Sequence, residues 1–109
     1  MSEFIVEKEN AGRRCCFFED DGETGYFYVY RSDGAEILDH LHIYNCSEKI
    51  GVEEGDVEVV WSRDGDKCGV KVWGNFYGIF DLDSETKLGC IIENRQTLPL
   101  QDTNMLSGF

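Results

Sequence analysis

Residues 59–90 read VVWSRDGDKCGVKVWGNFYGIFDLDSETKLGC, and this stretch decides the fold class. Runs rich in β-branched and aromatic residues are separated by Asp64-Gly65, Gly74-Asn75 and Asp83-Ser84. Such pairs form turns, because Gly and Asn tolerate positive φ angles while Asp and Ser cap the backbone with their side chains. The spacing predicts an antiparallel meander with strands at residues 57–62, 67–73, 76–82 and 88–93.

The upstream segment TGYFYVYRS, residues 24–32, has the same strand character. Its period of two places Tyr26, Tyr28 and Tyr30 on one face of a strand and the intervening Phe and Val residues on the other. Asp33-Gly34 is then expected to turn the chain.

Residues 35–45, AEILDHLHIYN, fit two patterns. Ile37, Leu41 and Tyr44 have helical spacing, whereas the second half of the segment alternates as a strand does. We favour a strand, because a hairpin after an Asp-Gly turn requires less new structure than a helix without clear caps.

The totals indicate a single domain. The chain has 109 residues, of which 41% are hydrophobic, and this suits one core spanning residues 1–109. The polar tail, residues 94–109, is expected to cross the sheet as a short helix or strap. We therefore predict a mainly β, single-domain antiparallel fold built from meanders and hairpins, as a sandwich or a partly closed barrel.

The charge limits the partners. The chain has 22 acidic and 10 basic residues, giving a formal net charge of −12. This charge repels nucleic-acid phosphates and anionic membranes, and it attracts basic proteins. Because the N-terminus lacks a basic segment followed by an apolar one, and no run approaches the roughly 20 apolar residues of a membrane span, we expect a cytoplasmic protein with reduced cysteines.

The candidate metal ligands do not have the spacing of a known site. Zinc prefers thiolate and imidazole ligands, and the chain offers Cys46, Cys68 and Cys90 with His40 and His42. No Cys-x-x-Cys pair is present, and His-x-His places both rings on one face of a strand. We predict no metal and no cofactor.

Two further motifs have simple structural explanations. The series Asp81-x-Asp83-x-Glu85 lacks the central Gly and distal Glu of a calcium loop and suits a solvated turn. Cys15-Cys16 suits a strand that points one thiol to each face, because buried Cys behaves as a small hydrophobic residue.

The catalytic alternatives are also weak. No Ser lies in a Gly-x-Ser-x-Gly elbow, and no glycine-rich loop could hold a phosphate. The carboxylates of Asp20, Asp21 and Glu23 are close in sequence, but carboxylates in exposed loops keep ordinary pKa values and make poor general acids. We predict that the protein is not an enzyme.

Three acidic segments remain, at residues 19–23, 53–58 and 81–85, and they alternate with strands that carry Tyr and Trp. Aromatic residues contribute most of the binding energy of many interfaces, and carboxylates steer basic partners. The residues predicted to bind the partner are Glu19, Asp20, Asp21, Glu23, Glu53, Glu54, Asp56, Tyr28 and Trp73.

The segments EDDGETGYFYVY, ILDHLHIYN, VVWSRDGDK and FYGIFDL resemble an uncharacterised bacterial family, a small β-rich domain of unknown function. The resemblance covers residues 18–82 and leaves out the tail. It implies a bacterial, cytoplasmic, β-rich domain and carries no reaction.

Three functions are therefore compared. The first is a binding module for a basic protein, most concretely an immunity-type inhibitor that occludes the site of a basic toxin such as a nuclease. The second is an enzyme or ligand sensor with a pocket near His40, His42, Tyr44 and the Asp-Gly turns. The third is a structural subunit joined through an exposed sheet edge. The sequence leaves the oligomeric state open.

Overall fold

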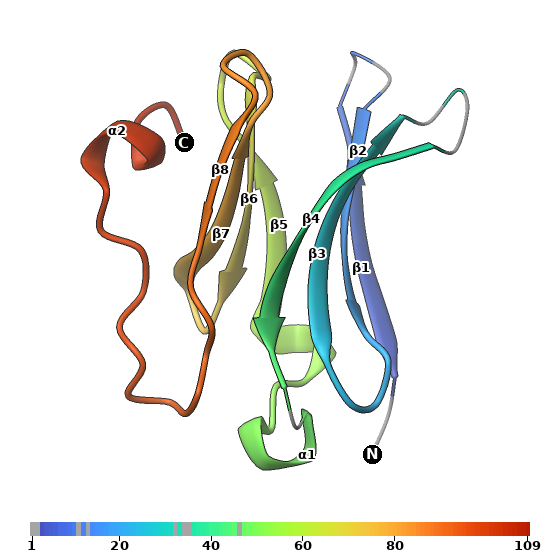
Figure 1. The fold of residues 1–109 in the computed structure, drawn as a ribbon, viewed down its shortest axis with the longest axis vertical. Helices are drawn as coiled ribbons and strands as arrows, with labels where there is room; N and C mark the ends of the chain where they lie inside the picture. The colour runs from blue at the N-terminus through green and yellow to red at the C-terminus, as the bar shows by residue number, and fades with distance from the viewer. Residues whose placement is uncertain (1–2, 11, 13, 32, 34–35, 46) are drawn as a thin grey trace.

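The computed structural model describes residues 3–10, 12, 14–31, 33, 36–45 and 47–109. Two four-stranded antiparallel sheets pack face to face without closing into a barrel (Figure 1). This confirms the predicted mainly β architecture and selects the sandwich. No helix of the described residues is long and apolar enough to cross a membrane.

The first sheet, sheet A, is a meander of the first four strands in chain order. These are β1 (Phe4–Glu9), β2 (Arg14–Asp20), β3 (Gly25–Arg31) and β4 (Glu36–Tyr44). The strand predicted for residues 35–45 is confirmed as β4, which pairs with β3 along its length, with two register shifts. The Asp33-Gly34 turn predicted before it includes Gly34, which lies outside the described residues.

The second sheet, sheet B, is the predicted second meander. Its strands are β5 (Val57–Trp61), β6 (Lys67–Val72), β7 (Asn75–Asp81) and β8 (Thr86–Gly89). The first three match the prediction to within one residue at each end. The fourth begins and ends earlier than expected, because after β8 the chain leaves β7 and the Ile92 N–H donates to the Ile43 carbonyl of β4 at 2.7 Å.

The turn between β6 and β7 is one residue earlier than predicted. Val72 pairs with Asn75, so the loop consists of Trp73 and Gly74, with φ angles of 53° and 82°. Two residues with positive φ form the turn whose twist matches a tight hairpin. The Gly conformation is easy to reach, whereas Trp73 adopts it at a cost in strain.

The core lies between the inner faces of the two sheets. The alternation predicted in residues 24–32 is confirmed, because Phe27 and Val29 point into this core and the three tyrosines point out. Cys16 and Cys68, from opposite sheets, are both fully buried in the core.

Two short helical segments connect the sheets, α1 (Ser47–Ile50) and the 3-10 turn η1 (Glu54–Asp56). The tail then crosses the outer face of sheet B, as predicted, and contains the short helix α2 (Thr103–Leu106) (Figure 1). It is tied down by the Leu100 N–H, which donates to the Phe76 carbonyl, and by the Tyr77 hydroxyl, which donates to the Thr97 carbonyl.

Candidate functional site

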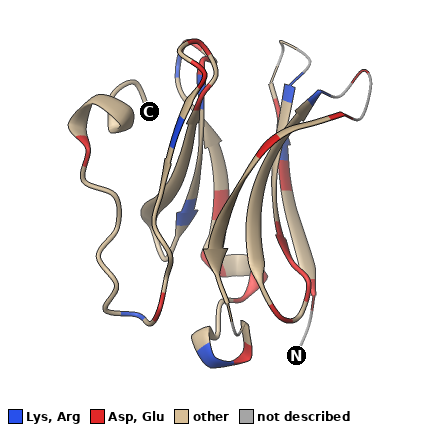
Figure 2. Ribbon diagram, viewed as in Figure 1, with Lys and Arg blue, Asp and Glu red and all other residues tan. Residues whose placement is uncertain are grey.

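Acidic residues that are far apart in the sequence meet at one end of the sandwich. The β2–β3 turn reaches this end and is joined to α1, because the Ser47 N–H donates to the Glu23 carbonyl at 2.9 Å. The turn η1 contacts β1 at the same end. Figure 2 shows the resulting group of acidic segments near the N-terminus. We call this group the acidic end, and it comprises Glu3, Asp21, Glu23, Glu48, Glu53, Glu54 and Asp56.

Hydrogen bonds within each loop hold these carboxylates in place. Asp21 accepts backbone N–H groups from Thr24 at 2.8 Å and Glu23 at 2.9 Å, and these bonds lower the pKa of its carboxyl group. Asp56 accepts the Glu53 N–H at 3.0 Å. The exposed Glu23, Glu53 and Glu54 side chains are free to meet a partner, because they form no ion pair with a cation of the described residues.

Asp20 does not belong to this surface, so its assignment as a partner-binding residue is wrong. Its side chain is 2% exposed and accepts the Tyr44 hydroxyl at 2.6 Å and the Gly22 N–H at 2.8 Å. Tyr44 is itself fully buried. The acidic run in the sequence hides this difference, because Asp20 is the last residue of β2 and faces inward, whereas Asp21 lies in the turn.

Trp73 lies at the acidic end but is only half-buried there. Its backbone N–H donates to the Asp56 carbonyl at 2.9 Å, which joins the β6–β7 turn to η1. Its ring packs against the core, and the Arg95 guanidinium carbon lies 4.5 Å from the ring centroid. Arg95 therefore covers one face of this ring.

Aromatic rings form a continuous patch on the outer face of sheet A. The ring centroids of Phe17 and Tyr28 are 4.7 Å apart, those of Tyr28 and Tyr26 are 5.9 Å apart, and those of Tyr26 and His42 are 4.6 Å apart. Tyr30 meets Phe17 edge-on at 5.5 Å. We call this patch the aromatic face, and it comprises Phe17, Tyr26, Tyr28, Tyr30, His40 and His42.

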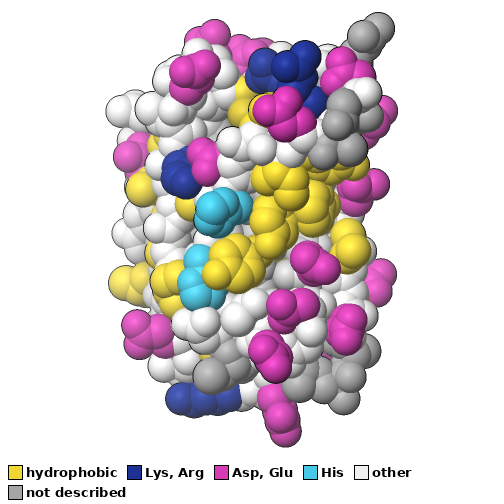
Figure 3. Space-filling model, turned by 45° about the vertical axis from the view of Figure 1, so that its right-hand side comes forward, with side chains coloured by type: hydrophobic (Ala, Val, Ile, Leu, Met, Phe, Trp, Pro, Cys, Tyr) yellow, Lys and Arg dark blue, Asp and Glu magenta, His cyan; other side chains and the backbone are white. Residues whose placement is uncertain are grey.

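Carboxylates border the aromatic face on its β1 and β2 side. The pairing of β1 with β2 places Glu7 beside Phe17 and Glu9 beside Cys15, and the pairing of β2 with β3 places Glu19 beside Tyr26. Figure 3 shows the hydrophobic patch with the histidines against it and acidic side chains below it. The aromatic face is therefore continuous with an acidic border.

The thiol beneath this face is inert. Cys15 is 1% exposed, and burial raises the pKa of its thiol to about 11. The Tyr30 hydroxyl above it donates to Glu7 at 2.7 Å. Cys16 points to the opposite face into the core, as the alternation predicts. A protonated, enclosed thiol is a poor nucleophile and a poor metal ligand.

The opposite end of the sandwich carries charges of both signs, and the acidic end also includes two cations, Lys49 of α1 and Arg95 beside Trp73. Both ion pairs found among the described residues lie at the opposite end: Arg31 with Asp33 at 3.7 Å, and Lys87 with Asp39 at 2.7 Å. The Asp81 carboxylate accepts hydrogen bonds from the N–H groups of Asp83 and Ser84 within the β7–β8 turn. The third acidic segment of the sequence is thus separated from the other two.

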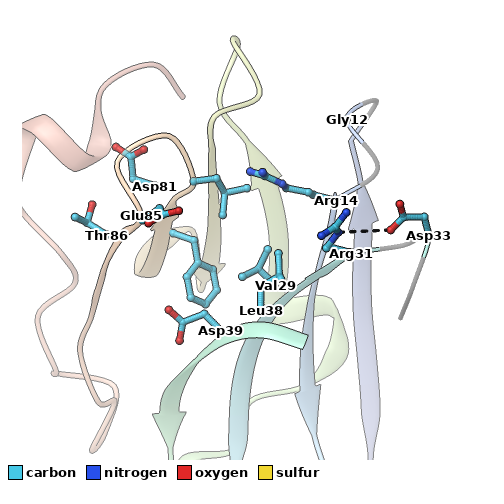
Figure 4. Close-up of a pocket in the computed structure, with 12 residues that line it drawn as sticks. Gly12, Arg14, Val29, Arg31, Asp33, Leu38, Asp39, Asp81, Glu85 and Thr86 are labelled. Carbon is cyan, nitrogen blue, oxygen red and sulfur yellow. Dashed lines mark ion pairs between the residues drawn. The ribbon is translucent and has the colours of Figure 1, made fainter. Parts of the chain in front are cut away.

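A cavity of about 700 Å³ opens between the sheets at this opposite end. Arg14 and Arg31 line one wall over a floor that includes Val29 and Phe80, and Asp39 lies on the other side (Figure 4). Burial alone would raise the pKa of Asp39, but hydrogen bonds from Lys87 and the His40 N–H outweigh it and lower the pKa. An ionised carboxylate of this kind is unsuited to donating a proton near neutral pH.

The enzyme or ligand-sensor hypothesis expects a pocket near His40 and His42, and the cavity lies elsewhere. His40 and His42 belong to the aromatic face and do not line the cavity, and Tyr44 is in the core. No cluster of three potential metal ligands occurs among the described residues, and Cys46 lies outside them.

A structural subunit, the third hypothesis, would need an exposed sheet edge, but side chains and other segments already bond to both edges of sheet A. On β4, the carbonyl of Ile43 accepts the Ile92 N–H, and the carbonyl of His40 accepts the Lys87 ammonium at 3.1 Å. The carbonyl of Lys8 on β1 accepts the Trp61 indole N–H at 3.0 Å. These bonds reduce the length of edge that could pair with another chain.

Of the residues predicted to bind the partner, Tyr28 lies on the aromatic face and Glu19 on its border, and the other rings of the face are not among the predicted residues. The alternation of Tyr26 and Tyr30 with Phe27 and Val29 correctly predicts that both tyrosines point outward. The histidines could not be added, because only the pairing of Tyr26 with His42 and Tyr28 with His40 brings β4 beside them.

Fold and surface together define a small antiparallel β-sandwich with an acidic end and an exposed aromatic face. The chain belongs to the family described as "Uncharacterized protein conserved in bacteria (DUF2251)", whose model matches residues 2–104. This confirms the resemblance to an uncharacterised bacterial family, and the match extends beyond residues 18–82 into the tail.

One relative is an uncharacterized protein of Haemophilus influenzae. It is 37% identical over 68 residues, which cover 60% of this chain and 42% of that protein. The chain thus matches less than half the length of this relative. No solved structure matches significantly.

Proposed function

We propose that this protein is a non-enzymatic binding module that captures a basic protein. The supporting observation is the acidic end, where the β2–β3 turn, α1 and η1 bring carboxylates together from residues 21–56. Gathering like charges costs free energy within the chain, and a cationic partner would offset that cost.

The most concrete form of this proposal is an immunity-type inhibitor of a basic bacterial toxin such as a nuclease. Carboxylates of the acidic end would occupy the positive site that otherwise holds nucleic-acid phosphates. Attraction over about 10 Å at 0.1 M salt would accelerate association, so binding would weaken as the salt concentration rises. A cytoplasmic location, which the sequence predicts, suits an inhibitor that protects the cell producing the toxin.

The test compares two variants with the same net charge. The first changes Glu23, Glu53 and Glu54 to Gln at the acidic end. The second changes Asp66 and Asp83 to Asn and Glu85 to Gln in the turns of the opposite end. All six side chains are exposed, and each variant loses three negative charges from the formal −12.

The tagged protein is used to capture partners from lysate of its own bacterium at low and high salt, and the eluate is identified by mass spectrometry. We expect a basic protein that elutes with salt and associates about tenfold more slowly with the first variant, but not with the second. Equal losses in the two variants would mean that net charge acts without a site. Failure to capture any salt-sensitive basic protein would refute the proposal.

A further inference from the structure

The outer faces of the two sheets differ in what covers them. On sheet B, the tail lies over the outer face, and the Phe109 ring packs 4.7 Å from Phe76. On sheet A, no segment of the described residues lies over the aromatic face, and Figure 3 shows its rings at the surface. Tyr26, Tyr28 and Phe17 are only half-buried, and His40 is exposed.

An uncovered set of stacked rings is unusual for a small soluble protein. Exposed aromatic patches of this kind mark binding surfaces, because their burial by a partner releases ordered water and adds large contact area. The hydroxyl groups of Tyr26 and Tyr28 have no hydrogen-bond partner among the described residues, so they are free to bond to a ligand. The aromatic face therefore has both apolar area and unused polar groups.

Carboxylates border this face on its β1 and β2 side, and Lys87 lies beside its β4 side, where the ammonium donates to the His40 carbonyl at 3.1 Å. On the same outer face, Glu7 pairs with Phe17 and Glu19 pairs with Tyr26, while Glu9 pairs with Cys15. The neighbouring Lys87 ammonium is already held by Asp39 at 2.7 Å. A ligand placed on the rings would thus meet carboxylates at the border without displacing a cation of this chain.

We propose that the aromatic face is the docking surface for the basic partner and that it selects arginine over lysine side chains. This inference rests on the proposed function and adds the surface and the chemistry that it recognises. A guanidinium group is planar, stacks on aromatic rings, and binds a carboxylate through two parallel hydrogen bonds. A lysine ammonium is more strongly hydrated and offers only a point charge, so it gains less from the rings.

Single-stranded nucleic acid also stacks on aromatic rings, but its binding requires basic residues along the backbone. Here the border of the rings carries carboxylates, which repel phosphate. The arrangement therefore favours an arginine-bearing protein segment.

The first experiment uses two probes, an oligo-arginine peptide and an oligo-lysine peptide of equal length, with the isotope-labelled full chain at low salt. We expect the arginine peptide to bind about tenfold more tightly, as the added stacking implies. Its chemical-shift changes should centre on Tyr26, Tyr28 and His42. Equal affinity for both peptides, or shifts confined to the acidic end, would overturn the inference.

Two variants test the rings and the border separately. Changing Tyr26 and Tyr28 to Thr keeps residues that favour strands, and we expect it to abolish the preference for arginine. The Glu19→Gln variant keeps every ring, and we expect weaker binding of both peptides with the preference retained. If the double Tyr variant does not fold, the shift map and Glu19→Gln still decide the matter.

The outcomes also separate this inference from the proposed function. Suppose that a basic protein is captured, that the acidic-end variant slows its association, and that the folded Tyr variant captures it normally. Docking on the aromatic face would then be refuted while the binding module stands. If the protein binds the two peptides with equal affinity and captures no basic protein, both proposals fail.

Discussion

The buried pair of Asp20 and Tyr44 is the clearest place to test the structure. The Tyr44 hydroxyl donates to the Asp20 carboxylate at 2.6 Å, where the two residues are 0% and 2% exposed. The Tyr44→Phe variant keeps the ring and removes only the hydroxyl. Among the described residues, the carboxylate then retains the Gly22 N–H at 2.8 Å as a donor, in a site that is almost closed to solvent.

A hydrogen bond to a charged group contributes about 1.5–3 kcal/mol, so we expect Tyr44→Phe to lower the free energy of unfolding by about 2 kcal/mol. For a chain of this length, this corresponds to a decrease in Tm of about 8 °C. The control is Tyr28→Phe, which removes a surface hydroxyl and should change the free energy of unfolding by less than about 0.5 kcal/mol. Urea and thermal unfolding followed by circular dichroism measure both variants.

The same pair gives a pH dependence of known sign. Burial, followed by the hydrogen bond to Asp20, raises the pKa of the Tyr44 hydroxyl above its usual value of 10.0. The unfolded chain therefore loses this proton first, and the stabilisation is present below pH 10 and is lost as the pH rises above it. The difference between wild type and Tyr44→Phe should shrink in that range.

Two results would refute the reasoning. If Tyr44→Phe unfolds within about 0.5 kcal/mol of the wild type, the buried bond does not stabilise the fold. If Asp20→Asn leaves stability unchanged but abolishes partner capture, Asp20 belongs to the binding surface and not to the core.

Two further predictions concern the packing of sheet A. A Cβ on Gly25 would lie 2.6 Å from the Tyr44 ring and 2.8 Å from the Phe18 ring. We therefore expect Gly25→Ala to lower the free energy of unfolding, measured in urea, by about 1–3 kcal/mol. The control Gly55→Ala, whose Cβ would have no atom within 4 Å, should leave it nearly unchanged. Burial raises the pKa of the Cys15 thiol to about 11, so about one thiol in a thousand is ionised at pH 8. We therefore expect iodoacetamide to label Cys15 only after unfolding, which peptide mass spectrometry can measure. Equal labelling of native and unfolded protein would contradict the enclosed position of this thiol.

Much of the fold follows from local patterns. The meander of β5 to β8 was predicted because each turn carries residues that tolerate positive φ or cap the backbone, and these preferences act within a few residues. β1 was not predicted, because FIVEKE places three apolar residues before three charged ones and so lacks the alternation of a half-buried strand. The ambiguous segment 35–45 became a strand because β3 offers it a complete set of hydrogen-bond partners.

The sequence by itself determined the β class, the outward direction of Tyr26, Tyr28 and Tyr30, and the negative charge, because composition, alternation and turn chemistry are local properties. Only the tertiary structure decided that Asp20 is buried while Asp21 is exposed, that two of the three acidic segments meet, and that His42 stacks on Tyr26. These features depend on strand pairing and sheet packing, which bring together residues far apart in the chain. The free energy of such a contact depends on both residues that form it, so neither segment of sequence alone can predict the contact.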